Sequence, residues 1–598
     1  MNLPRRLRDP LPWLGALSLA LLATLILRDP LDVAVAGYAL PAMLTALVLL
    51  ATAVWWPIVR DQRPNPAAFD AIALRGGLSV AAILGSGFVA TMATGTDEAR
   101  RDAIVWASIA GAAAVFAMTS WIAVQVSGVG TGLLAVPLIT SVLLYLADTR
   151  GVQHLWVGGW RPPLGIALVA DRLSALMLLV ASLVTLSVHV FATGQDAEER
   201  KVETPVSIFH PTFLLLSAGV SNAFLAGDLF NLFVGFEMLL FSSYVLLTLG
   251  GTADRIRAGA TYVVVNLLSS SLFLVALAAV YAATGTINMA QLSLRLPDLG
   301  DNVQGALQFA LLAVFAIKAA VFPLSAWLPD SYPTAPAPVT AVFAGLLTKV
   351  GVYAILRTQT VLFDHRPLGT LLLVAALATM LVGIAGAVAQ VEIKRILSFT
   401  LVSHIGFMVF GIGLATPDGL SGAIFYTAHH ITIQTALFLV VGLVERVGGT
   451  TSIDRLGGLA AASPVLGALF FVPAMNLAGI PPMSGFVGKL GLLDAGVRAG
   501  TPLAWLLVAG SVVTSLLTLY AVAKIWSRSF WADPVEGAPP PPTKVRLPRL
   551  QTATAMTMVA LTLLIAVLAG PLYAYTDRAA ETLRSGEYAR TVLAEVAS

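Results

Sequence analysis

Four charged side chains lie deep inside long apolar stretches. Of the 35 Lys and Arg residues, Lys318, Lys349 and Lys489 lie in the interior of predicted membrane spans, and of the 32 Asp and Glu residues, Glu237 lies deep in one. A charge at the bilayer centre costs from about 2.5–3.5 to more than 10 kcal/mol, so such residues usually face a bundle interior and mark an ion path. One glutamate cannot neutralise three lysines. At least two lysines therefore need water, backbone carbonyls or loss of the proton, which favours proton transfer over an ion pair that only fixes helix packing.

Two of these lysines lie beside predicted helix breaks. Pro323 follows Lys318 by five residues, and the pair Pro481-Pro482 precedes Lys489. Proline removes a backbone donor and disrupts a regular helix. Discontinuous helices at membrane depth free carbonyls and helix ends for ions and water. An ordinary proline kink is the alternative at each position, but two breaks that each accompany a lysine favour a transport site.

The two breaks resemble each other in sequence. Residues 323–327 and 482–486 share the order proline, apolar, serine, small, aromatic. The second predicted break lies five spans after the first, and an odd offset places two copies in opposite orientations. The pattern predicts an inverted repeat of five-helix units, each containing a broken helix, as is common in transporters.

Three histidines within apolar spans could carry protons between these groups. They are His404 and the adjacent pair His429 and His430. Their ordinary pKa lies near neutrality, which suits a relay, although a lone membrane histidine can also be a hydrogen-bonded packing residue. Adjacent histidines point to different helix faces and have no Cys or carboxylate at ligand spacing, so we expect no metal site. The sequence also contains no phosphate-binding loop and no nucleophile elbow, and we expect no cofactor.

The composition tells which elements must position these residues. The 598 residues are 58 % hydrophobic and 11 % charged, with a formal charge of +3. Soluble domains carry about 25 % charged residues. The composition therefore excludes a soluble enzyme, a nucleic-acid binder and a disordered chain, and predicts an all-α polytopic membrane protein in contact with lipid. The absence of cysteine excludes disulfides and cysteine-ligated iron–sulfur clusters from this chain.

About seventeen transmembrane helices are predicted from apolar length. They fall near 12–28, 36–56, 76–96, 104–127, 130–147, 171–194, 208–226, 229–249, 258–283, 303–322, 337–356, 367–389, 396–415, 419–444, 463–480 (continuing past a break to 497), 503–526 and 551–575. Asp171 and Asp228 stand at helix starts, where the helix dipole stabilises a carboxylate. A cytoplasmic N-terminus, kept as a first helix rather than cleaved as a signal peptide, puts most Lys and Arg on the cytoplasmic side.

The predicted organisation has four parts. Residues 1–103 are extra N-terminal transmembrane helices to which we assign no role. Residues 104–531 form the core, residues 532–550 a cytoplasmic proline-rich linker, and residues 551–598 the last transmembrane helix with an amphipathic or disordered tail.

The motifs around the buried charges resemble those of antiporter-like subunits. This family occurs in multisubunit Mrp-type Na⁺/H⁺ antiporters, in complex I and in membrane-bound hydrogenases. The matching segments are Asp228–Glu237 with Ser243–Leu247, Lys318–Pro323 with Trp327–Asp330, Thr348–Tyr353, Glu392–Ser398 with Ser403–Gly406, and Gly479–Lys489. Within the family, three short runs are most similar to the D subunits of the Mrp antiporters: Gly165–Arg172, Leu249–Thr252 and Thr261–Asn266.

The resemblance implies a role for each buried group. Glu237 and Lys318 would form the input pair of a half-channel, and Lys349 would be the next relay site. Lys489 would be the distal site near the opposite exit. His404, with His429 and His430, would supply or lead to intermediate relay groups.

One departure from the family pattern concerns the helix that carries the histidine pair. Gln434 stands where the family usually has a lysine, and glutamine bonds water but holds no titratable charge. The relay must therefore cross this helix through histidine or water, or follow another path.

The resemblance implies a transporter subunit rather than an enzyme. We expect a proton-translocating subunit of a multisubunit monovalent cation (Na⁺)/proton antiporter, multi-pass in a bacterial inner or plasma membrane, whose partners are the other antiporter subunits. Three alternatives stay open: a pumping subunit of a complex I-like or hydrogenase redox complex, a solitary transporter for an organic solute, and a scaffold that has lost transport. Because no acidic cluster beyond Glu237 suits Na⁺ desolvation, we favour a proton path in this chain. The sequence leaves cation selectivity, stoichiometry and the composition of the complex open.

Overall fold

The computed structural model describes residues 131–163, 165–195, 206–533 and 547–594. The chain divides into two compact units, Met1–Leu143 and Leu144–Ser598. The second unit holds nearly all described residues. The spans predicted before residue 128, and the predicted boundary at 103/104, lie outside the described residues.

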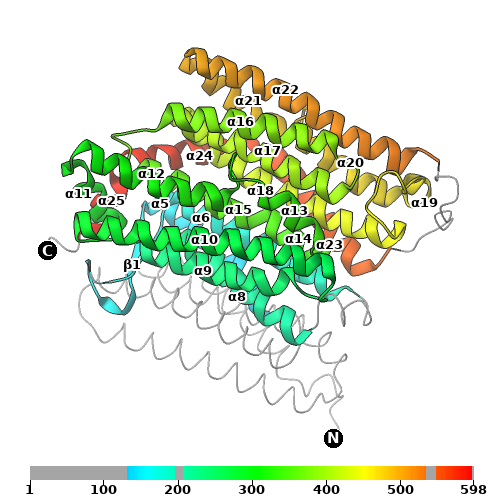
Figure 1. Ribbon diagram of the computed structural model, residues 1–598, viewed down its shortest axis with the longest axis horizontal. Coiled ribbons are helices and arrows are strands. Elements are labelled where there is room, and N and C mark those ends of the chain that lie inside the picture. Colours follow the sequence, from blue (N-terminus) through cyan, green and yellow to red (C-terminus); the bar gives the residue numbers. More distant parts are fainter. Residues whose placement is uncertain (1–130, 164, 196–205, 534–546, 595–598) are drawn as a thin grey trace, which may run out of the picture. The chain divides into compact units, whose positions relative to one another are not determined.

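Long helices make up most of the second unit, where they lie side by side (Figure 1). In chain order the longer helices are α5 (Thr131–Arg150), α6 (Arg172–Thr193), α8 (Val206–Leu225), α9 (Leu229–Leu247), α10 (Ala253–Thr284), α12 (Asp301–Ala319), α16 (Gly369–Ala389), α17 (Ile393–Leu414), α18 (Pro417–Gly448), α20 (Pro464–Ala478), α21 (Ser484–Ala499), α22 (Pro502–Ile525), α23 (Arg549–Val567) and α24 (Ala569–Arg584). The shorter ones are α11 (Met289–Arg295), α13 (Trp327–Ser331), α14 (Ala337–Val342), α15 (Thr348–Arg357), α19 (Leu459–Ala462) and α25 (Glu587–Ala594).

Several short segments depart from α-helical geometry. Three are π-helical: η5 (Phe343–Leu347), η6 (Thr358–Leu362) and η7 (Trp526–Trp531). Three are 3₁₀-helical: η2 (Val157–Gly159), η3 (Leu296–Asp298) and η4 (Tyr332–Thr334). π-helical turns are rare and are frequently found at functional sites. Two of them here bracket α15, the helix that carries Lys349.

Helix starts follow from local side-chain chemistry. Asp171 accepts a bond from the backbone of Ser174 at the start of α6, and Asp228 does the same for Asn231 at the start of α9. Thr416 caps α18 in the same way, with Pro417 in the first turn. Such caps satisfy backbone donors that have no partner within the helix. The two carboxylates thus stand at helix starts, as predicted.

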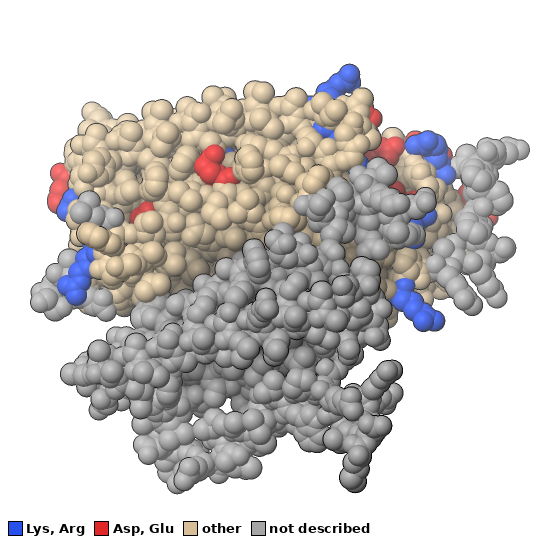
Figure 2. Space-filling view, turned by 90° about the horizontal axis from the view of Figure 1, so that it is seen from below, with Lys and Arg blue, Asp and Glu red and all other residues tan. Residues whose placement is uncertain are grey.

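The helices match the dimensions of a membrane protein. Among the described residues, eleven helices are long and apolar enough to cross a bilayer. Figure 2 shows one face on which the Lys and Arg side chains gather at the two ends, with a broad, mostly uncharged belt between them. The predicted helical polytopic fold is confirmed. The count of seventeen spans and the inverted repeat of five-helix units stay predictions.

The core of the unit consists of α17, α18 and the segment Ala337–Leu362. The apolar window of this segment is entirely buried, and that of α17 nearly so. Helix α18 packs against α17, α21, α24 and the π-helical segment η5. These central helices carry Lys349 and the three predicted relay histidines, so the candidate relay groups lie where water is most excluded.

The last predicted span, 551–575, is divided in the structure. Helix α23 ends at Val567, and a separate helix, α24, follows it. Pro571 explains the end of α23, because its ring clashes with the carbonyl four residues earlier, at Val567. The guanidinium of Arg578 in α24 binds Asp148 at 2.8 Å. The tail is therefore a packed part of the unit.

A small hairpin accompanies the helices. Strands β1 (Gln153–Trp156) and β2 (Ala167–Ala170) pair antiparallel, with Gln153 opposite Ala170. The sequence analysis did not predict this hairpin, because both strands are short. It leads directly into the Asp171 cap of α6.

Candidate functional site: a buried chain of charged and polar groups

Lys318 lies at the first helix break. Helix α12 ends at Ala319, and Ala320 adopts a left-handed conformation with φ of 58°. The Lys318 ammonium is buried and donates to the Ser270 hydroxyl at 3.0 Å and to the Asn266 carbonyl at 3.3 Å. Both acceptors belong to α10. The predicted break is therefore present, and the lysine is held by polar groups of a neighbouring helix.

Glu237 lies on α9, which also packs against α10. Its Oε1 atom is buried and has no hydrogen-bond partner. Glu237 and Lys318, the input pair that the resemblance implies, form no ion pair in the described structure. Phe236, the residue before Glu237, lies under the ammonium instead, with its ring centre 5.7 Å from Nζ. The structure thus holds the expected input pair apart.

Lys349 follows the π-helical segment η5 and is fully buried. Its ammonium donates to the Ala344 carbonyl at 2.5 Å. Ala344 lies within η5, so the acceptor belongs to the π-helical turn itself. A backbone carbonyl therefore stabilises the Lys349 ammonium, as is expected for a buried lysine that has no carboxylate partner.

Glycines bring Lys349 close to its neighbours. A Cβ atom at Gly351 would lie 2.6 Å from the backbone nitrogen of Ala319, so α15 and the end of α12 touch backbone to backbone. A Cβ atom at Gly345 would lie 2.3 Å from the Thr435 hydroxyl of α18. The segment that holds Lys349 is therefore packed tightly between the first break and the helix of the histidine pair.

Lys489 lies at the second helix break. Helix α20 ends at Ala478, Gly479 is left-handed with φ of 89°, and α21 begins at Ser484. The Lys489 ammonium donates to the carbonyls of Leu477 at 3.1 Å and Ala478 at 2.9 Å. The C-terminal end of a helix carries partial negative charge, so it is a favourable place for a cation. Lys489, the predicted distal site, therefore caps the C-terminal end of α20.

The two breaks share a backbone pattern. Ala320 and Gly479, the left-handed residues, each lie three positions before the matched prolines Pro323 and Pro482. The next amide in each case bonds a carbonyl five residues back, from Val321 to Ala316 at 2.9 Å and from Ile480 to Met475 at 3.2 Å. The sequence likeness thus corresponds to a local structural likeness. The relation between the whole five-helix units stays a prediction.

The three histidines lie between the Lys349 segment and Lys489. The His404 ring pairs with the Tyr426 hydroxyl at 3.1 Å, and its centre lies 5.2 Å from that of His430. The His429 ring pairs with the Ser484 hydroxyl, at the start of α21, at 3.0 Å. Helix α18 therefore connects the central and distal parts of the chain through side-chain contacts.

Several buried polar atoms of α18 have no protein partner in the described structure. They are Nε2 of His429, both ring nitrogens of His430, and Oε1 of Gln434. The amide of Gln434 donates to the Leu397 carbonyl at 2.8 Å, which fixes its orientation. Buried polar groups are normally satisfied, often by ordered water. These atoms therefore mark places for water at the helix where the usual lysine is missing.

One buried ion pair was not found from the sequence. Arg357 and Asp171 are 1 % and 0 % exposed, and the guanidinium binds both carboxylate oxygens, with Nη2 to Oδ1 at 2.8 Å. The predicted span 337–356 ends one residue before Arg357, so the sequence places Arg357 in a loop. In the structure the segment continues through the π-helical η6. The one sequence feature that could have pointed to this ion pair is the position of Asp171 at the start of a helix.

No metal site is present among the described residues, in the sense that no three His, Cys, Asp or Glu side chains are grouped to hold an ion. The described site is instead a line of groups that can bind, hold or pass a proton.

The comparisons with known proteins agree with this geometry. A family model described as "NADH:quinone oxidoreductase/Mrp antiporter, TM" matches residues 226–518, which contain every predicted relay residue. The D subunit of the Na⁺/H⁺ antiporter of Alkalihalophilus pseudofirmus is 41 % identical over 458 residues, which cover 76 % of this chain and 90 % of the relative.

Two solved structures extend the likeness to the fold. A chain of the Mrp complex from Dietzia sp. aligns with a TM-score of 0.71 and 31 % identity, covering 88 % of this chain and 100 % of that one. A chain of the archaeal membrane-bound sulfane sulfur reductase aligns with a TM-score of 0.73 and 26 % identity, covering 81 % and 99 %.

The fold and the site together define a multi-pass, antiporter-like membrane subunit, a class shared by cation antiporters and respiratory complexes. Within that class, the chain belongs to the family formed by the D subunits of Na⁺/H⁺ antiporters.

Proposed function

We propose that this chain is the proton-translocating subunit of a multisubunit Na⁺/H⁺ antiporter, a transport role rather than an enzymatic one. The observation that carries the proposal is the continuous packing of the elements that hold the buried groups. Helix α10 packs between α9 and α12, α12 packs on α15, η5 packs on α18, and α18 packs on α21. Glu237, Lys318, Lys349, the histidines and Lys489 thus follow one another through the interior.

The first step in our mechanism is a change in the Glu237–Lys318 interaction. Two unit charges about 4 Å apart attract by about 4 kcal/mol at an effective dielectric constant of about 20, which is roughly a thousandfold in proton affinity. When the two side chains meet, the attraction holds the proton on Lys318. When they separate, or when Glu237 is protonated, that hold is released. The bonds of Lys318 to α10, in place of an ion pair with Glu237, support this step.

The later steps carry the proton towards the distal lysine. From Lys318 it passes to Lys349 across the tight contact at Gly351. It crosses α18 through His430, His404 and His429 and the water that their unpartnered nitrogens can bind. It then reaches Lys489 at the second break. Because Gln434 cannot titrate, the histidines carry this crossing.

The direct test uses the assembled complex in proteoliposomes with an imposed pH gradient. Replacing Glu237 or Lys318 with alanine should abolish Na⁺-driven proton exchange while the complex still assembles. Full exchange by either assembled variant would overturn the proposal. Running the assay with Na⁺, K⁺ and Li⁺, and with and without the partner subunits, identifies the exchanged cation and tests the dependence on the complex.

A second candidate is supported by the likeness to the sulfane sulfur reductase chain. The same relay would then be driven by redox chemistry in a partner subunit. Neighbouring genes distinguish the two functions, because small antiporter subunits accompany the first and quinone- or NADH-handling subunits the second. The higher identity to the antiporter relatives favours the antiporter.

A further inference from the structure

Arg357 of the buried Arg357–Asp171 pair stands on the same helix as Lys349, and the pair has no part in the mechanism above. Lys349, Tyr353 and Arg357 follow one another at intervals of four residues, so they share one face of α15. At 1.5 Å per residue, Arg357 lies about 12 Å from Lys349 along the helix axis. This face therefore leads from the relay lysine towards the end of the bundle.

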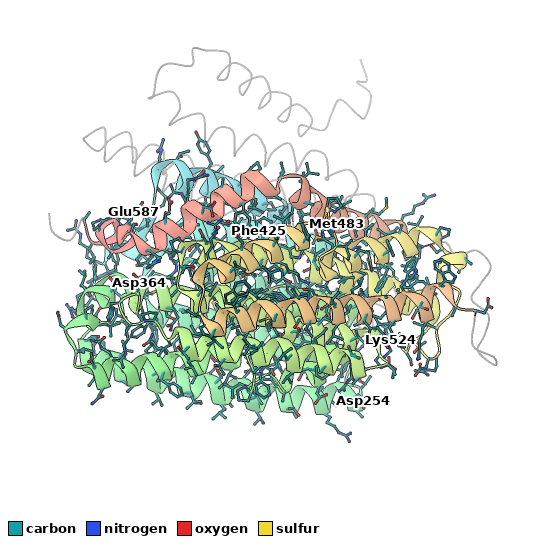
Figure 3. The ribbon with its side chains drawn as sticks, turned by 90° about the horizontal axis from the view of Figure 1, so that it is seen from above. Asp254, Asp364, Phe425, Met483, Lys524 and Glu587 are labelled. Atoms are coloured by element: carbon teal, nitrogen blue, oxygen red, sulfur yellow. The ribbon has the colours of Figure 1, made fainter. Side chains whose placement is uncertain are left out.

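The end of the bundle towards which this face of α15 leads carries polar groups and a cavity. In Figure 3, Asp364 and Glu587 lie at one end of the helices, and Asp254 and Lys524 lie at the other. A small cavity of about 20 Å³ lies there, with Gln359, Thr360 and Asp364 among its lining residues. Along the chain, Arg357 thus stands between Lys349 and the polar residues of the Asp364 end.

We propose that the Arg357–Asp171 pair is a seal that prevents protons from leaving the relay along α15 to the Asp364 end. This inference rests on the proposed function of Lys349 as a relay group. Because the seal closes the route along α15, protons on Lys349 continue through α18 towards Lys489.

The chemistry of Arg357 suits a barrier. A guanidinium does not release its proton in proteins, so it cannot pass one on. The barrier needs the guanidinium to stay in place, and the two bonds to Asp171 and one to the Ser174 hydroxyl, at 2.8 Å, fix it there.

The other polar groups on this face are already engaged. The Tyr353 hydroxyl donates to the Phe224 carbonyl at 2.7 Å and accepts from Arg357 Nη2 at 2.9 Å. Asp171 accepts bonds from Arg357 on both carboxylate oxygens and from the backbone of Ser174 on Oδ1. An opposite charge in direct contact favours the ionised carboxylate, so Asp171 does not accept a relayed proton.

The test measures passive proton leak through the assembled complex in proteoliposomes, with a pH gradient but without a Na⁺ or K⁺ gradient. The main variant is D171N/R357Q, because it removes both charges together and leaves two amides that can bond each other. We expect its pH gradient to decay at least several-fold faster than that of the wild type. A decay rate equal to the wild type would overturn the seal.

One control variant separates charge from packing. R357K keeps a cation paired with Asp171 but makes fewer hydrogen bonds, so it should hold the gradient as long as the wild type. Equal leak from R357K and D171N/R357Q would show that the pair only fixes packing, and would overturn the proposal.

A third variant links the leak to the relay. Adding K349Q to D171N/R357Q should remove the leak, since the source of the protons is gone. Leak that persists in the triple variant would overturn the seal as a barrier on the Lys349 route. The antiport of K349Q alone tests the proposed function separately, because that assay does not depend on the state of Arg357.

Discussion

At the scale of single residues, the buried lysines use backbone carbonyls in place of carboxylates. Lys349 bonds the carbonyl of Ala344, and Lys489 bonds the last carbonyls of α20. Irregular backbone supplies these acceptors in both cases, a π-helical turn in the first and a helix end in the second. A carbonyl accepts a hydrogen bond but carries no full charge, so it holds the lysine without locking its proton in place.

Lys489 has a matched control in Lys524. The ammonium of Lys524 also caps a helix end, donating to the carbonyls of Val388 at 3.1 Å and Gln390 at 2.8 Å after α16, but it lies outside the proposed relay. We expect K489Q to lose Na⁺-driven proton exchange and K524Q to keep it, as measured with a pH-sensitive dye in proteoliposomes. Loss of exchange in both variants at equal assembly would mean that capping a helix end, and not relaying a proton, is what these lysines do.

Asp228 yields a prediction about pH. Burial raises the pKa of this carboxyl to about 6, although bonds from the backbone amides of Asn231 and Ala167 oppose the rise. The ordinary value is 3.8, so the folded protein binds more protons than the unfolded chain between these values. Folding stability therefore falls as the pH rises from about 4 to 6, by roughly 3 kcal/mol.

The variant D228N should remove that dependence. Asparagine caps helices as well as aspartate does, and it does not titrate. We expect the apparent melting temperature of the complex to fall less from pH 4 to pH 6.5 in D228N than in the wild type. If the melting temperatures of D228N and the wild type change equally with pH in that range, Asp228 is not the group responsible for the pH dependence.

At the scale of elements, close helix contacts determine how near the relay groups can come. Helix α15 meets the end of α12 at Gly351, where a side chain has no room. Overpacking in a tight contact typically costs about 1–3 kcal/mol. The contact also determines the distance between the segments that hold Lys318 and Lys349.

Replacing Gly351 with alanine tests that contact. We expect G351A to lower the melting temperature of the complex and to reduce exchange more than its stability loss explains, because the two lysines are pushed apart. Gly570 of α24 is a suitable control, since a Cβ atom there would meet nothing within 4 Å. If G351A and G570A behave alike in exchange and melting, the contact is not critical.

Local signals in the sequence were enough to place the helix breaks. Proline removes a backbone donor and clashes with the preceding turn of a helix, so the breaks beside Lys318 and Lys489 could be predicted without knowledge of packing. The burial of Arg357 could not be predicted, because it depends on a π-helical extension and on Asp171, which lies far away in the sequence. The separation of Glu237 from Lys318 likewise depends on side chains of a third helix, α10.

At the scale of the whole molecule, the end of the chain packs on the central helix. Ile565 and Ala569 form a buried cluster with Phe425 of α18, and Ser421 of α18 bonds the Thr576 hydroxyl at 2.9 Å. The amphipathic composition of this tail resembles that of a loose surface segment. Only the tertiary contacts show that it covers α18.

Deleting residues 569–598 should therefore prevent assembly. The deletion would expose the apolar surface of α18 around Phe425, whereas R578A removes only a largely exposed ion pair with Asp148, usually worth about 0–1 kcal/mol. We expect size-exclusion chromatography to show an intact complex for R578A and none for the deletion. An intact complex from the deleted chain would show that α24 and α25 are dispensable.

The π-helical turn η5 has a consequence for the direction in which α15 faces. A π-helical turn holds one more residue than an α-helical turn, so everything after η5 is rotated by about 100° from where an unbroken helix would place it. Lys349, Tyr353 and Arg357 share this rotation because α15 is regular between them. If η5 relaxed to α-helical geometry, α15 would rotate as a rigid unit. Lys349 and Arg357 would then turn away from their partners together.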